Sequence, residues 1–243
     1  MKYFIANWKM NPVTEKEAIA IAQDIDEENV MIAPPFVFLK TLARRVKKAS
    51  LAAQDVFWEN PKGAYTGEIS AGMIKSLGVS SVIIGHSERR RYGGDTDERV
   101  NRKTRAALSQ NLSVIVCVGE PEVVRKKGMK SAERYVKAQL GKDLVGISKK
   151  NLNRVTIAYE PVWAIGTGMS AKPEEASSMM LRIKRYMKER YGVGIIKTIY
   201  GGSVTEKTIK GFMKEKAIEG FLVGGASLNP RSFKNLIQAE KRL

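Results

Sequence analysis

The segment VIVCV, residues Val114 to Val118, and the segment VTIAY, residues Val155 to Tyr159, are almost continuously apolar. Parallel strands that are covered on both faces show this pattern, whereas strands with one wet face alternate apolar and polar residues. Both segments are also short and rich in β-branched residues, which favours strands over helices. They therefore predict a parallel sheet that is buried on both sides.

Six further runs of the same type extend the pattern in both directions along the chain. They begin near Tyr3, Val30, Leu51, Ser81, Ile196 and Gly220. Each run is followed by a segment that can form a helix, and side-chain oxygens that can cap free backbone amides indicate helix starts at Thr14, Ser70, Asp95, Thr205 and Asn229. Gly78 suits the end of the helix before the fourth strand. The chain thus repeats a strand and a helix eight times.

Alternating strands and helices can form either an open doubly wound sheet or a closed (β/α)8 barrel. Eight evenly spaced units in 243 residues fit the closed form. No Gly-x-Gly-x-x-Gly follows the first strand, as it would in a dinucleotide-binding sheet. We therefore expect an α/β protein with eight parallel strands, outer helices and a single catalytic domain that spans residues 1–243.

Composition narrows the class of protein without selecting one function. The chain carries 42 Lys and Arg against 25 Asp and Glu, a formal charge of +17, which suits nucleic acid, an anionic surface or an anionic substrate. The basic residues are scattered in pairs and triplets without interleaved aromatic residues, so we expect no nucleic-acid partner. No apolar run approaches the roughly 18 to 20 residues that cross a bilayer, so we expect no membrane partner. Cys117 is the only cysteine, which fits a reducing cytoplasm.

Polar residues and glycines follow the expected strands at the end where barrel enzymes carry out their chemistry. They are Asn7 and Lys9 after the first strand, Gly85 and His86 after the fourth, Glu160 after the sixth, Gly201, Gly202 and Ser203 after the seventh, and Gly224 and Gly225 after the eighth. The set combines a base, a donor that can be neutral, a cation and two glycine-rich anion sites. It suits the removal of a proton beside the carbonyl group of a phosphorylated substrate. It contains no cluster of His and Cys for a metal ion and no Cys and His pair for nucleophilic attack.

Five segments resemble the signature segments of the triosephosphate isomerase family, in the family's order along the chain. They are ANWKMN (Ala6 to Asn11), IIGHSERR (Ile83 to Arg90), AYEPVWAIGTG (Ala158 to Gly168), YGGSV (Tyr200 to Val204) and GFLVGGASL (Gly220 to Leu228). The resemblance implies a TIM barrel that interconverts dihydroxyacetone phosphate and D-glyceraldehyde 3-phosphate in glycolysis and gluconeogenesis. In this family a proton is transferred through an enediolate, without a metal ion or an organic cofactor.

The resemblance also implies roles for individual residues. Glu160 would be the base, His86 the neutral electrophile, Lys9 the cation that balances substrate charge, and Asn7 the residue that places the enediolate oxygen, while Ser87 and Glu88 would support them. The substrate's phosphate group would bind backbone amides at Gly166, Ser203, Gly224 and Gly225. The mobile lid would comprise Pro161, Val162, Trp163, Ala164, Ile165, Gly166, Thr167 and Gly168. The helix start just beyond His86 would favour the neutral imidazole.

The segment from Trp58 to Ser70 is longer than a barrel needs and resembles the family's dimerisation loop. Thr66 would approach Asn7 and Lys9 of a second chain, and Gln54 would support that interface, so the resemblance implies a homodimer.

Two other functions remain open from the residues themselves. One is another phosphosugar-binding barrel enzyme, because the phosphate site after the last two strands is widely shared. The other is a basic barrel with an additional polyanion-binding role.

Overall fold

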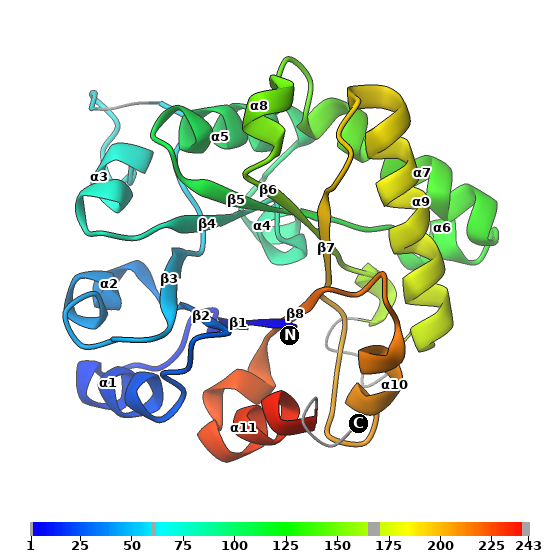
Figure 1. Ribbon diagram of the computed structural model, residues 1–243. Coiled ribbons are helices and arrows are strands. Elements are labelled where there is room, and N and C mark those ends of the chain that lie inside the picture. Colours follow the sequence, from blue (N-terminus) through cyan, green and yellow to red (C-terminus); the bar gives the residue numbers. More distant parts are fainter. Residues whose placement is uncertain (1, 60–61, 165–170, 240–243) are drawn as a thin grey trace.

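The computed structural model describes residues 2–59, 62–164 and 171–239 and shows the expected closed barrel of eight parallel strands (Figure 1). The strands are β1 (Tyr3–Asn7), β2 (Val30–Ala33), β3 (Ser50–Ala53), β4 (Ser81–Ile84), β5 (Ser113–Val118), β6 (Val155–Tyr159), β7 (Lys197–Tyr200) and β8 (Gly220–Val223). Each begins within one residue of its predicted start. The barrel closes between β1 and β8, where Tyr3 pairs with Gly220. A Cβ at Gly220 would lie only 2.5 Å from the carbonyl oxygen of Tyr3, so glycine permits this closure.

Helices surround the ring of strands in Figure 1. They are α1 (Glu15–Asp24), α2 (Phe36–Leu42), α3 (Ala71–Ser76), α4 (Ser87–Tyr92), α5 (Asp97–Ser109), α6 (Glu122–Arg125), α7 (Met129–Asp143), α8 (Lys149–Leu152), α9 (Pro173–Tyr191), α10 (Ile209–Lys214) and α11 (Pro230–Gln238), with short 3-10 turns η1 (Val162–Ala164) and η2 (Gly225–Leu228). Within the described part of the chain, no helix has both the length and the apolar composition needed to cross a bilayer.

The helix boundaries follow the predicted caps with two exceptions. Thr14, Ser70 and Asn229 each accept a backbone N–H as expected, and Gly78 ends its helix with a φ of +80°. Asp95 was expected to cap α5, but Thr96 does so, because the buried carboxylate of Asp95 is held by the ammonium group of Lys103 at 2.7 Å. Thr205 forms a turn with Thr208, and α10 begins only at Ile209.

Buried side chains form two layers because successive residues of a strand point to opposite faces. On β1, Phe4 and Ala6 point outward into the core between strands and helices, whereas Ile5 points into the barrel. The barrel interior is filled by residues from all eight strands, namely Ile5, Ala33, Ala52, Ile83, Ile115, Cys117, Ala158, Ile199 and Leu222. The barrel is therefore a packed core, and the polar residues collect where the strands end.

Candidate active site

His86 lies directly after β4 and caps the short helix α4. Its Nδ1 accepts the backbone N–H of Glu88 at 3.2 Å. A ring nitrogen accepts a hydrogen bond only when it carries no proton, so a neutral His86 bears its proton on Nε2. That Nε2 lies 3.3 Å from Oε1 of Glu160. The fold thus brings Nε2 of His86, which is the donor nitrogen whenever Nδ1 is the acceptor, close to the Glu160 carboxylate.

Glu160 follows β6 and is only 1% exposed. Its Oε2 accepts the backbone N–H of Ser87 at 3.0 Å, and its Oε1 accepts no hydrogen bond from the described residues. Burial, with an added effect of the Glu160 carboxylate, raises the pKa of the Cys117 thiol well above its ordinary value, so the sulfur stays protonated beside Glu160. A buried carboxylate with one uncommitted oxygen is suited to accept a proton.

Asn7 is the last residue of β1, and Lys9 lies just after it in a constrained turn. Lys9 has a φ of +55°, which is uncommon for a residue other than glycine, and its backbone N–H donates to Oδ1 of Asn7 at 3.1 Å. Its carbonyl oxygen accepts from the side-chain amide of Gln54 at 2.8 Å. Its ammonium group forms an ion pair with Glu88 at 2.5 Å. The turn therefore holds a cation at the same end of the barrel as His86.

A cavity of about 330 Å³ opens between the ends of β1, β7 and β8. Its lining includes the predicted residues Asn7, Lys9, His86, Ser203, Gly224 and Gly225, together with Gly201, Gly202 and Thr205. A Cβ at Gly224 would lie 3.1 Å from Cε of Lys9, so glycine lets the lysine side chain pass close to the backbone. Glu160 stands behind this wall, since a Cβ at Gly201 would come within 2.8 Å of its Cγ.

The first residues of the predicted lid form the turn η1. The indole N–H of Trp163 donates to Oε1 of Glu120 at 3.0 Å, and the hydroxyl of Tyr159 donates to the same carboxylate at 3.1 Å. Burial, followed by the nearby Glu120, raises the pKa of Tyr159 far above its ordinary value, so the phenol remains a donor. The Ser203 hydroxyl donates to the carbonyl of Ala164 at 2.8 Å. Ile165, Gly166, Thr167 and Gly168 lie outside the described residues.

Glu120 was not among the residues selected from the sequence. It is fully buried and follows β5 after one intervening residue, Gly119. An acidic residue so close to the end of a strand, at the same rim as Glu160, was the signal that could have identified it. Glu120 joins the ends of β5 and β6 to the start of the lid.

Aromatic side chains pack together in the described part of the predicted dimerisation loop and at the residue before it. The ring of Phe57 lies 4.8 Å from that of Tyr65 and 4.3 Å from that of Trp58. Thr66 is exposed and lines neither the cavity of about 330 Å³ nor one of about 270 Å³ that Lys9 also lines. The lining of the cavity of about 270 Å³ includes Lys9, His86, Glu88, Met10, Gln54 and Arg89.

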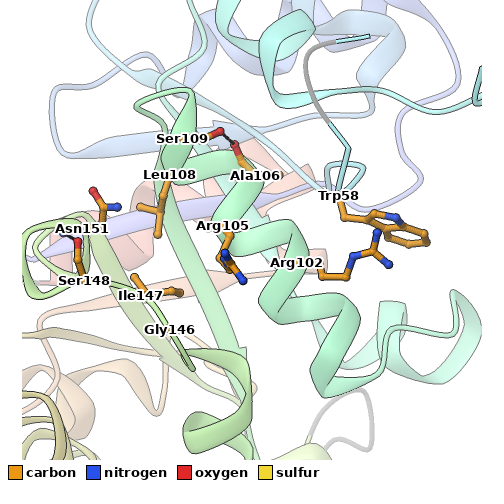
Figure 2. Close-up of a pocket in the computed structure, with 10 residues that line it drawn as sticks. All are labelled: Trp58, Arg102, Arg105, Ala106, Leu108, Ser109, Gly146, Ile147, Ser148 and Asn151. Carbon is orange, nitrogen blue, oxygen red and sulfur yellow. Dashed lines mark hydrogen bonds between the residues drawn. The ribbon is translucent and has the colours of Figure 1, made fainter. Parts of the chain in front are cut away.

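Figure 2 shows a larger cavity, of about 540 Å³, on the outer wall of the barrel. It lies between α5 and the segment from Gly146 to Asn151, and its lining includes Arg102 and Arg105 but none of the residues at the strand ends. Among residues 2–59, 62–164 and 171–239, no group of three or more His, Cys, Asp or Glu side chains is arranged to hold a metal ion.

Comparisons with known proteins agree with this geometry. The family model described as Triosephosphate isomerase matches residues 2–240. A triosephosphate isomerase of Dictyoglomus thermophilum is 42% identical over 98% of this chain and 99% of its own length. Those of Caldanaerobacter subterraneus subsp. tengcongensis and Acetivibrio thermocellus are 44% and 42% identical, over 95% and 97% of this chain and 96% of each relative. This chain belongs to the triosephosphate isomerase family, the isomerases that interconvert dihydroxyacetone phosphate and D-glyceraldehyde 3-phosphate in glycolysis.

Proposed function

We propose that Glu160 is the base of this isomerase and that His86, Lys9 and Asn7 stabilise the enediolate. The observation that carries the proposal is the 3.3 Å approach of His86 Nε2 to Glu160 Oε1, which puts a neutral donor and a buried carboxylate beside one cavity. Glu160 removes a proton from the carbon next to the substrate carbonyl, and the electron pair moves onto the carbonyl oxygen. The hydroxyl proton passes from the oxygen on that carbon to the former carbonyl oxygen, and the same carboxylate returns its proton to the former carbonyl carbon, so that the carbonyl group moves to the first carbon.

The developing negative charge needs donors that are in place before the reaction. His86 donates from Nε2, because its Nδ1 is already engaged by the backbone of Glu88. The ammonium group of Lys9 adds a positive charge, and Asn7 lines the same cavity. Glu160 does not line the cavity itself, so its carboxylate leaves the backbone N–H of Ser87 and turns past Gly201 when substrate is bound.

The substrate's phosphate group is expected at the opposite wall of the same cavity. Ser203, Gly224 and Gly225 line it, and backbone amides near glycines can approach an anion closely. Gly166, which lies outside the described residues, would contribute a further backbone amide to this phosphate site from the lid. Trp163 and its partner Glu120 hold the first part of the predicted lid.

Replacement of Glu160 by Gln tests the assignment of the base. The variant should fold and bind phosphate but lose nearly all isomerase activity in an assay coupled to glyceraldehyde 3-phosphate formation, because an amide accepts no proton. Glu174→Gln, at an exposed position of α9, is the matched control and should keep full activity. A folded Glu160→Gln enzyme with near-normal turnover would show that another group is the base.

His86→Gln tests the electrophile separately. An amide still donates a hydrogen bond, so this variant should lose less turnover than the variant without the base. Equal and complete losses in the two variants would point to a different role for His86.

We also propose that the whole of residues 1–243 acts as one catalytic domain and that two copies form a homodimer through the loop around Thr66. The cavity of about 270 Å³ beside Lys9 offers space for the tip of a partner's loop, and Gln54 lines it. Met10, which lines this cavity, is 92% exposed in the single chain, and Tyr65 of the predicted loop is 47% exposed, as expected for surfaces that a partner covers. The single cysteine supports a cytoplasmic location.

Light scattering of the wild-type protein should report a dimer. Deletion of residues 63–67 should give a monomer with strongly reduced activity, because the loop tip would no longer reach the second site. An unchanged mass together with unchanged activity would exclude this loop as the interface.

A further inference from the structure

Arg90 on α4 makes more directed contacts than its position on a short helix requires. Its Nε donates to the carbonyl of Gly85 at 2.9 Å, its Nη1 to Asp97 at 2.8 Å and its Nη2 to Asp143 at 2.7 Å. Nη2 also lies 3.4 Å from the carbonyl oxygen of Cys117. Gly85 directly precedes His86, and Cys117 belongs to β5. One planar guanidinium thus joins the ends of two neighbouring strands to two outer helices.

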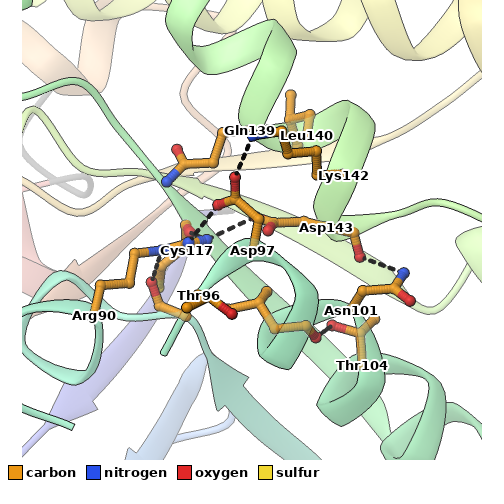
Figure 3. Close-up of polar contacts among 12 residues, drawn as sticks. Arg90, Thr96, Asp97, Asn101, Thr104, Cys117, Gln139, Leu140, Lys142 and Asp143 are labelled. Carbon is orange, nitrogen blue, oxygen red and sulfur yellow. Dashed lines mark hydrogen bonds and ion pairs between the residues drawn. The ribbon is translucent and has the colours of Figure 1, made fainter. Parts of the chain in front are cut away.

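The outer helix α7 supplies the buried end of this arrangement. Asp143 is its last residue, and the side chain of Asp143 is completely buried (Figure 3). Asn101 of α5 donates to the backbone carbonyls of Asp143 and Val145 at 3.0 and 2.9 Å, which secures the end of α7. The position of Asp143 therefore does not depend on Arg90 alone.

Gln139 lies one turn before Asp143 on α7, so the two side chains share a face of the helix. Its Oε1 accepts the backbone N–H of Gly119 at 2.9 Å. Gly119 packs directly on the backbone of Glu160, since a Cβ there would lie 1.6 Å from the carbonyl oxygen of Glu160. The backbone N–H of Glu160 donates in turn to Val118 at 2.8 Å. A second path thus leads from α7 to Glu160.

The energetics favour a positional role over a stabilising one. A buried ion pair often contributes little net stability, because removing both charges from water offsets their attraction. Here Oδ1 of Asp143 accepts no hydrogen bond from the described residues, which adds to that cost. Burial also raises the pKa of Asp143 above its ordinary value, although Arg90 opposes this effect. A contribution to the free energy of unfolding therefore explains the Arg90–Asp143 ion pair poorly. The positions that the ion pair imposes on α4 and α7 explain it better.

We propose that α7 is the common scaffold of the catalytic pair, with Arg90, Asp143 and Gln139 as positioning residues that set His86 and Glu160 relative to one another. This inference rests on the catalytic roles proposed above. One face of α7 reaches His86 through Arg90 and Gly85, and it reaches Glu160 through Gly119. The phosphate group is expected at the part of the cavity lined by Ser203, Gly224 and Gly225, which neither path includes, although His86 lines another part of the same cavity. Loss of a positioning residue should therefore reduce turnover more than substrate binding.

Arg90→Lys and Gln139→Met are the test variants. Lysine keeps the charge of Arg90 but cannot join Gly85, Asp97 and Asp143 at once, and methionine fills the space of Gln139 without an acceptor. We expect kcat to fall by about ten- to a hundredfold in each, since displacements of about 1 Å have effects of this size. KM and the inhibition constant of inorganic phosphate should change by less than about threefold, because binding of the phosphate group is retained.

Conservative variants and a control on the same helix separate positioning from general stability. Asp143→Asn keeps an acceptor for Arg90, and Gln139→Glu keeps one for Gly119, so both should retain more turnover than Asp143→Ala and Gln139→Met. Lys137→Met removes an ion pair between Lys137 and Glu133, which both lie on α7. This ion pair belongs to neither path to the strand ends, so the variant should keep the wild-type kcat. His86 is the only histidine, so its imidazole nitrogens can be followed by NMR and should shift in Arg90→Lys but not in Lys137→Met.

Folded Arg90→Lys and Gln139→Met enzymes with wild-type kcat would overturn the inference, as would a rise in KM at unchanged kcat. A loss of kcat in Lys137→Met equal to that in Gln139→Met would also overturn it. If Arg90→Lys fails to fold, Gln139→Met alone decides. An active Glu160→Gln enzyme would instead refute the catalytic assignment, so the two failures are distinguishable.

Discussion

Replacement of Gly119 by Ala should displace Glu160, the proposed base, without changing a residue that contacts the substrate. A Cβ at this position would lie 1.6 Å from the carbonyl oxygen of Glu160 and 2.5 Å from its carbonyl carbon. Non-bonded carbon and oxygen atoms settle roughly 3.5 Å apart, so the two backbones must separate by about 2 Å. Backbone atoms cannot turn away as the end of a side chain can. The Glu160 carboxylate must therefore move with them or the end of β5 must rearrange.

The magnitude follows from the size of this shift. A misplacement of about 1 Å can lower a rate by about a hundredfold, so kcat should fall by at least that factor, which corresponds to about 2.7 kcal/mol of activation free energy. Overpacking should also lower the free energy of unfolding by about 1 to 3 kcal/mol. Inorganic phosphate should still inhibit normally, because its expected site follows β7 and β8.

The assay is steady-state kinetics of glyceraldehyde 3-phosphate formation, with urea unfolding of the same samples. Gly194→Ala is the matched control, because a Cβ at Gly194 meets no atom within 4 Å. It should change neither kcat nor stability appreciably. A folded Gly119→Ala enzyme with kcat within about twofold of the wild type would show that the position of Glu160 does not depend on this contact.

Three further outcomes are expected. Trp58→Ala should raise the dissociation constant of the proposed dimer at least about tenfold in sedimentation equilibrium, because the indole packs against Phe57 and two arginine side chains lie over it; an unchanged constant would show that Trp58 does not hold the proposed interface in place. Asp26→Asn should lower the free energy of unfolding by about 1 kcal/mol at pH 7, because Asp26 accepts three backbone N–H groups from residues 47–49. Partial burial opposes these bonds, but they lower the pKa of Asp26, so its ionised form stabilises the fold above pH 4 and this contribution is lost as the pH falls through that lowered pKa. The difference between wild type and variant in urea unfolding should therefore shrink at pH 3, and a constant difference would contradict the assignment. Added neutral salt should lower kcat/KM more than kcat if the +17 charge steers an anionic substrate; insensitivity to salt combined with RNA binding in a filter assay would assign the charge to a second role.

The sequence was sufficient for the fold because its information is local. Most strands are largely apolar runs, and each strand start was predicted to within one residue. Three of the five predicted helix caps, Thr14, Ser70 and Asn229, were correct, because a cap depends on residues three positions apart. Asp95, one of the two exceptions, shows where local reasoning ends. Its carboxylate was a plausible cap in the sequence, but Lys103, two turns further along α5, binds it in the folded protein, and Thr96 takes its place.

The candidate site divides in the same way. Asn7, Lys9, His86 and Glu160 could be selected from the sequence, because barrel chemistry occurs where strands end and because their segments resemble one family. The residues that hold these side chains in place could not be selected from the sequence. Glu120 meets Trp163, Gln139 meets Gly119 and Arg90 meets Asp143, and each pair is separated by at least twenty residues. The sequence by itself determined which side chains stand at the rim of the barrel, whereas barrel closure and the packing of the outer helices decided their distances. The physical reason is that such contacts depend on the relative placement of whole elements, which no local pattern of residues encodes.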